Sequence, residues 1–151
     1  MNSIQRCPEC NAIWTDLTCQ DCFHQMLLWD LENTASDPGV HHLTVLCSHL
    51  QHPGLYSPEG LTGAMQLLTD FLVHGLSPQA VRRRDQAKMD SGKRKFKIRA
   101  SPTSRGAYIH PVKWTITAAD VAAGGLDAYA DNVRAWAQSV VQDLQAAGNL
   151  C

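Results

Sequence analysis

Two cysteine pairs near the N-terminus constrain the fold of this chain more than any other feature. They are Cys7-Pro-Glu-Cys10 and Cys19-Gln-Asp-Cys22, which together form a CxxC-x8-CxxC pattern. Two residues between cysteines allow a tight turn to direct both thiolates at one ion, and two such turns supply the four sulfur ligands of a closed tetrahedral site. We therefore expect Cys7, Cys10, Cys19 and Cys22 to bind zinc in a small knuckle spanning residues 1–24.

Two other interpretations of these cysteines remain open, an iron site and a pair of disulfides. Four thiolates also bind iron, and paired cysteines form disulfides in exported proteins. No apolar run follows Arg6, so we expect no secretory signal and predict a cytoplasmic protein. The chain also lacks a run of about 18 consecutive apolar residues, so we expect no membrane partner.

Beyond the knuckle, apolar residues recur at helical spacing, which predicts a mainly α domain of four or five helices over residues 25–151. The 151 residues suit one domain packed with the knuckle as a unit, and the eight-residue spacer leaves room for a short hairpin. Helices are predicted over 23–31, 40–51, 57–75, 78–88 and 129–148. Ser-Pro pairs at 57–58 and 77–78 are typical helix starts, and Thr117-Ala-Ala-Asp120 resembles a capping box.

The apolar faces of these helices predict the core. Cys47 lies on such a face and is expected to be a core residue rather than a metal ligand. The other core positions are Leu43, Leu46, Leu50, Leu61, Leu68, Phe71, Leu72, Tyr129, Val133, Trp136 and Val140.

A group of histidines forms a second candidate site. On a helix over 40–51, His42, His49 and His52 fall on one arc beside the apolar stripe, and His24 directly follows the last cysteine of the knuckle. Several imidazoles and a carboxylate could hold a second metal and activate water, as in a hydrolase. The alternative is that these rings cap helices, bind backbone groups or stay half exposed. The chain contains no HExxH motif.

A basic run follows in the second half of the chain. Nine of the 13 Lys and Arg residues lie within 82–99, opposed there by Asp85 and Asp90, so this stretch carries +7 and the remainder −8. Such a surface can bind phosphates of nucleic acid or an acidic partner; the alternative is a solvated face that balances the acidic remainder. The candidate contacts are Arg82, Arg83, Arg84, Lys93, Arg94, Lys95 and Lys97.

Three blocks of the sequence resemble an uncharacterised bacterial family of small proteins, a domain of unknown function. They are CPxC…CxDCFHQML, HHLTVLxxxLQHPxxYS, and WTIT…DV followed by YADNVRAWAQSVVQDL. The resemblance implies a soluble bacterial protein with a four-cysteine site near the N-terminus, and it implies no activity, substrate or partner.

Together these patterns predict a zinc-containing binding or regulatory module with a basic surface for nucleic acid or another polyanion, rather than an enzyme. A metal-dependent, hydrolase-like enzyme that uses the histidines is the alternative. Convergence of His24, His42, His49 and His52 on one ion would favour the enzyme, and scattered rings would favour the binding module.

Overall fold

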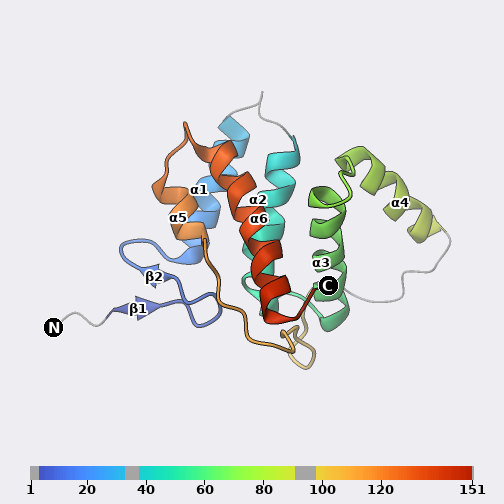
Figure 1. Cartoon of the computed structure of the whole chain (residues 1–151), viewed down its shortest axis with the longest axis horizontal. Helices are drawn as coiled ribbons and strands as arrows, with labels where there is room; N and C mark the ends of the chain where they lie inside the picture. Colours follow the sequence, from blue (N-terminus) through green and yellow to red (C-terminus); the bar gives the residue numbers. More distant parts are fainter. Residues whose placement is uncertain (1–3, 33–37, 91–97, 151) are drawn as a thin grey trace.

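The mainly α architecture is confirmed by the computed structural model, which describes residues 4–32, 38–90 and 98–150 (Figure 1). Within those ranges the chain forms six α-helices, a 3-10 turn and a two-stranded antiparallel hairpin. The elements are β1 (Gln5–Arg6), β2 (Ile13–Trp14), α1 (Cys19–Glu32), α2 (Pro38–Leu50), η1 (Pro53–Leu55), α3 (Pro58–Leu72), α4 (Pro78–Asp90), α5 (Ala118–Ala123) and α6 (Tyr129–Ala147). None of the described helices combines the length and apolarity needed to cross a membrane.

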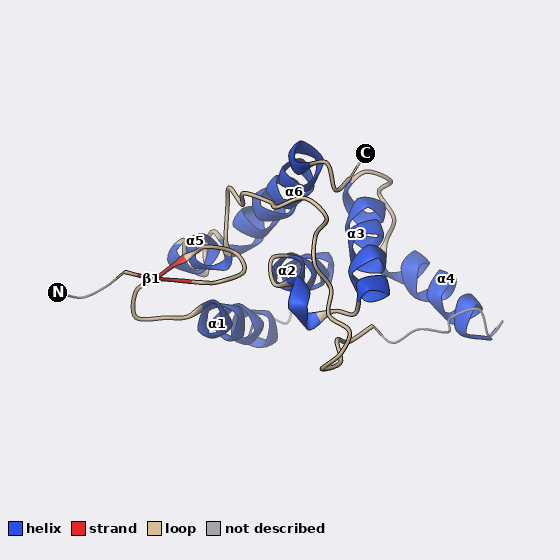
Figure 2. Cartoon of the chain, turned by 90° about the horizontal axis from the view of Figure 1, so that it is seen from below, coloured by secondary structure: helices blue, strands red, loops and turns tan. Residues whose placement is uncertain are grey.

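Helix α2 is the centre of the fold. In the end-on view of Figure 2, α1, α3 and α6 surround it, and α4 lies beyond α3. Thr44, Cys47 and Leu50 on α2 are completely buried, so Cys47 is a core residue as predicted. The Thr44 hydroxyl shares a 2.7 Å hydrogen bond with the Tyr129 hydroxyl of α6, which satisfies both buried groups. The packing of α1, α3 and α6 around α2 therefore holds this helix in place.

The predicted core is confirmed. Phe71 and Leu72 are partly buried at its edge, and the other predicted residues are buried within it. The core also contains Val121 of α5, a helix that packs against both α1 and α6. This short helix starts at a complete capping box between Thr117 and Asp120, as its sequence pattern indicated.

Helix α1 begins at Cys19, and the predicted start at Phe23 is wrong. Thr18 and Asp21 cap this end reciprocally: the Thr18 N–H donates to the Asp21 carboxylate at 3.0 Å, and the Asp21 N–H donates to the Thr18 hydroxyl at 3.2 Å. The second cysteine pair therefore lies on the first turn of a helix. The domain boundary expected after residue 24 falls inside α1, and we keep as a proposal that the knuckle and the helices pack as one unit.

The segment that follows α4 returns across the start of α3. The Ile98 carbonyl accepts a 2.8 Å hydrogen bond from the Ser57 N–H, and the Ala100 N–H donates to the Leu55 carbonyl at 3.1 Å. Gly60 lies against this segment, because a Cβ at that position would be 2.3 Å from the Ile98 carbonyl oxygen. A residue without a side chain is thus required where the two backbones meet.

This contact yields a prediction with an internal control. Gly60→Ala is expected to lower the free energy of unfolding by about 1–3 kcal/mol, because the added carbon must displace backbone. Gly63→Ala on the same helix is expected to raise it by about 0.5–1 kcal/mol, since a Cβ at Gly63 meets nothing within 4 Å. Urea unfolding measures both changes, and equal stabilities of the two variants would contradict the close approach.

Candidate metal centre

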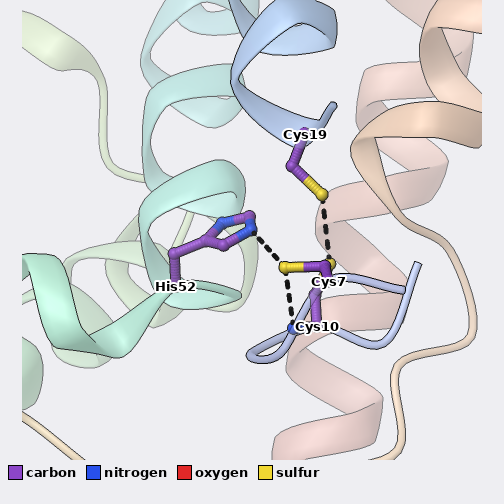
Figure 3. A group of neighbouring side chains, drawn as sticks. All are labelled: Cys7, Cys10, Cys19 and His52. Carbon is purple, nitrogen blue, oxygen red and sulfur yellow. Dashed lines mark hydrogen bonds between the residues drawn. The ribbon is translucent and has the colours of Figure 1, made fainter. Parts of the chain in front are cut away.

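Four side chains converge where the hairpin, the start of α1 and the end of α2 meet. They are Cys7, Cys10, Cys19 and His52, and their sulfur and ring-nitrogen atoms all lie within 4.8 Å of one another (Figure 3). Cys7, Cys10 and Cys19 are buried and His52 is partly buried. In the described ranges this is the one group of three or more Cys, His, Asp or Glu residues arranged to hold a metal ion.

The hairpin positions the first two cysteines. The Cys7 N–H donates to the Ala12 carbonyl at 2.8 Å, and the Asn11 N–H donates to the Cys7 carbonyl at 2.9 Å. Asn11 closes this turn in the left-handed region, with φ at 64°, which asparagine tolerates better than most residues. The turn directs the Cys10 N–H at the Cys7 sulfur, 3.5 Å away. The first CxxC pair therefore forms the tight turn that its spacing predicts.

Cys19 is the first residue of α1, and its sulfur receives hydrogen bonds. The Trp14 indole N–H donates to it at 3.2 Å, and the Cys10 sulfur lies 3.5 Å away. The hydrogen bond from Cys10, aided by those from His52 and Trp14, lowers the pKa of the Cys19 thiol to about 4 despite its burial. Cys19 is therefore held as a thiolate, the form that binds metals.

His52 follows the C-terminal end of α2, and a backbone carbonyl orients its ring. The Nδ1 atom lies 2.6 Å from the Ser48 carbonyl oxygen, so Nδ1 carries the hydrogen and donates it. The Nε2 atom then faces the Cys7 sulfur at 3.5 Å. A ring held through one nitrogen by a backbone carbonyl, with the other nitrogen turned to the site, is the usual arrangement of a metal-binding histidine.

The electrostatics of the cluster favour positive charge. Burial would lower the pKa of His52, but hydrogen bonds with Cys19, the Ser48 carbonyl and Cys7 raise it to about 9. These neighbours thus favour the protonated imidazole when no other cation is present. A divalent ion at the same place would supply that charge and compete with the proton.

Cys22, the expected fourth ligand, lies outside the converging group. It sits one helical turn after Cys19 and is buried in the main apolar core together with Met26. Burial, followed by the nearby Cys19 and Asp21, raises the pKa of its thiol. Cys19 belongs instead to the small buried cluster that also contains Cys7 and Cys10. His52 is the fourth member of the converging group, whereas the sequence pattern placed it in a separate histidine site.

The remaining candidate histidines do not form a second cluster of three ligands among the described residues. His24 is exposed, and His49 is partly buried with its ring centre 5.6 Å from that of Phe23. His42 lies elsewhere, 5.9 Å from the ring of Phe71. The hydrolase-like alternative therefore lacks a metal-binding constellation in this part of the chain.

A cavity adjoins the converging group on one side, with a volume of about 560 Å³. Cys7, Cys19 and His52 form part of its wall, together with His24 and His49. The predicted histidine site thus has a partial counterpart: three of its four members line one cavity, and His42 does not.

The structure separates the candidate polyanion contacts into different environments. Arg82 and Arg83 are exposed on α4. Arg84 instead binds the buried Asp70 of α3, with 2.5 Å between the Arg84 Nη1 and Asp70 Oδ2 atoms. Burial would raise the pKa of Asp70, but the bonds from Arg84 and Gln66 outweigh it and lower this pKa. Arg84 therefore anchors α4 to α3. Lys93, Arg94, Lys95 and Lys97 lie outside the described residues.

Comparison with known proteins identifies a family for most of the chain. No curated protein and no solved structure matches it. A family of unknown function, DUF5946, matches residues 5–145, a range that includes all four converging side chains and almost all of the helical part. The resemblance to an uncharacterised family is confirmed, and the chain belongs to the family of unknown function DUF5946.

Proposed function

We propose that this chain is a zinc-binding protein in which Cys7, Cys10, Cys19 and His52 hold one ion. The observation that carries the proposal is the spacing of the four ligand atoms. Tetrahedral zinc with sulfur at ~2.3 Å and nitrogen at ~2.0–2.1 Å places neighbouring ligand atoms about 3.6–3.8 Å apart. The Cys10–Cys19 sulfur pair and the Cys7–His52 pair are each separated by 3.5 Å.

The ion would join the N-terminal hairpin to the helices. The cluster around it is small: Cys7, Cys10, Ala12 and Cys19 are its buried members, with Trp14 and Trp114 packed against them. So small an apolar cluster cannot by itself offset the conformational entropy of ordering the hairpin. Four protein ligands close the coordination shell, which supports a structural role for the ion.

Counting the zinc bound by single-ligand variants tests which residues hold it. Purified protein is expected to contain one zinc per chain by native mass spectrometry. His52→Ala and Cys10→Ser are expected to lose the ion, whereas Cys22→Ser retains it, because Cys22 is packed in the apolar core. Zinc retained by His52→Ala and lost by Cys22→Ser would establish the four-cysteine site instead.

We further propose that the exposed face of α4 binds a polyanion such as nucleic acid. The supporting observation is the contrast between neighbouring arginines. Arg84 is neutralised by Asp70, whereas Arg82 and Arg83 point into solvent without an ion pair to any described residue. Exposed guanidinium groups that are not neutralised within the fold are suited to phosphate contacts.

Salt dependence tests this second proposal. Replacing Arg82 and Arg83 together with alanine is expected to weaken nucleic-acid binding for all sequences alike and to reduce the slope of log K against log salt by about 2. Arg105→Ala, an exposed arginine outside the basic run, serves as the control and should leave the slope unchanged. Fluorescence anisotropy measures both quantities, and an undetectable interaction at low salt would disprove the proposal.

A further inference from the structure

Two of the three cysteines of the proposed metal centre line the adjoining cavity. Of the five cysteines that the structure describes, Cys7 and Cys19 line the cavity, whereas Cys10, Cys22 and Cys47 are buried away from it. Its volume of about 560 Å³ is within the range typical of small-molecule sites. A small molecule in the cavity would therefore contact Cys7 and Cys19.

The two cavity-lining sulfurs differ in the hydrogen bonds that they accept. Cys19 receives the Trp14 indole N–H at 3.2 Å. Among the described residues, the Cys7 sulfur has a longer contact of 3.5 Å with the Cys10 N–H, besides the His52 nitrogen that would bind the ion. A donated hydrogen bond stabilises charge on sulfur and so reduces its nucleophilicity. Cys7 is therefore the less shielded sulfur.

We propose that Cys7, held as a thiolate by the ion, is a nucleophile for small soft carbon electrophiles that enter this cavity. The inference rests on the proposed metal centre. Three thiolates and a neutral imidazole around a divalent ion leave one net negative charge on the centre, and metal coordination keeps the sulfur deprotonated at neutral pH. The other walls of the cavity include the aromatic side chains of Trp14 and Phe23, which suit a partly apolar molecule.

The reaction is a simple displacement. A sulfur lone pair of Cys7 forms the new S–C bond while the carbon releases its leaving group together with the bonding electron pair. No proton is transferred, because the sulfur is already a thiolate. The product is a thioether, which is a weaker zinc ligand, so alkylation would loosen the centre.

Alkylation of the zinc-loaded protein by iodoacetamide tests the inference, with peptide mass spectrometry to map each adduct. Cys7 is expected to react first, about tenfold faster than Cys10, Cys22 or Cys47. Trp14→Phe is expected to raise the rate at Cys19 relative to that at Cys7, because it removes the indole donor to Cys19. Equal rates at Cys7 and Cys10 would overturn the inference.

A matched pair of leucine substitutions tests the role of the cavity. Leu55 belongs to the cavity wall and is 53% exposed, so it lies at the rim, whereas Leu28 on α1 is 47% exposed and lies outside the wall. Leu55→Trp is expected to slow alkylation of Cys7, and Leu28→Trp to leave it unchanged. An equal rate in both variants would also overturn the inference.

Zinc content is measured in each sample before alkylation, so that the two proposals fail separately. Protein that contains zinc but reacts without preference for Cys7 refutes the nucleophile and leaves the metal centre in place. Protein that binds no zinc refutes the centre, and the inference with it.

Discussion

Chelation of the ion is expected to lower the free energy of unfolding of this chain by about 4 kcal/mol. The reference is the same protein with free zinc at 1,000 times the dissociation constant of the zinc complex. The size of the effect follows from mass action, because the ion binds the folded arrangement of its four ligands and not the unfolded chain. Those ligands come from separate segments: Cys7 and Cys10 belong to a hairpin of two-residue strands, and His52 follows the end of α2. Thermal unfolding with and without a chelator measures the effect.

His52→Ala provides the control for that experiment. It is expected to melt at the temperature of the chelated parent protein and to show no further change on chelation. Because the ligands must be deprotonated to bind, and hydrogen bonds raise the pKa of His52 to about 9, the stabilisation by zinc should weaken as the pH falls below about 9. A parent protein with the same melting temperature in zinc and in chelator would contradict a structural ion.

Truncation of Trp136 is expected to have the next largest effect. Trp136 of α6 is completely buried and is the largest of the fully buried side chains. Trp136→Ala should cost about 3–5 kcal/mol through lost burial and the cavity that remains. Gln138→Ala, at an exposed position of the same helix, should change stability by less than ~0.5 kcal/mol. Urea unfolding measures both.

Trp136→Phe separates the size of the side chain from its polar atom. The buried indole nitrogen of Trp136 has no hydrogen-bond partner among the described residues, so the parent protein already bears the cost of an unsatisfied donor. Phenylalanine removes that donor while it fills most of the space, and the expected cost is below ~1.5 kcal/mol. Equal costs for the Phe and Ala variants would indicate that the N–H group is satisfied.

Local sequence patterns predicted those parts of the fold that depend on a single helix. Ser57 caps α3 as expected, accepting a hydrogen bond from the Gly60 N–H, and Gly148 ends α6 with a φ of 89°. The start of α1 was also encoded, since Thr18-x-x-Asp21 repeats the Thr-x-x-Asp pattern recognised at Thr117. It was missed because the cysteine spacing was interpreted as a separate knuckle rather than as a helix start.

The full ligand set of the candidate metal centre could not be predicted from such local patterns. Cys7, Cys10 and Cys19 were predicted from spacing within a short segment, but His52 is 45 residues from Cys7 in sequence. A helical projection shows which residues share a face of one helix, and it placed His52 with His42 and His49. Which end of α2 meets the hairpin depends instead on the packing of α1, α3 and α6 around α2, and no local pattern encodes that arrangement.

The position of the ligands in the chain also bears on the order of assembly during synthesis. All four lie within the first 52 residues, whereas α6, which packs against α2, occupies Tyr129–Ala147. At typical elongation rates the 95 residues from His52 to the end of α6 require about 5–20 s. Zinc can therefore bind the nascent chain and secure α1 against α2 before the ribosome has made α6, the main partner of α2. Ribosome-bound chains with residue 52 clear of the exit tunnel are expected to carry the ion.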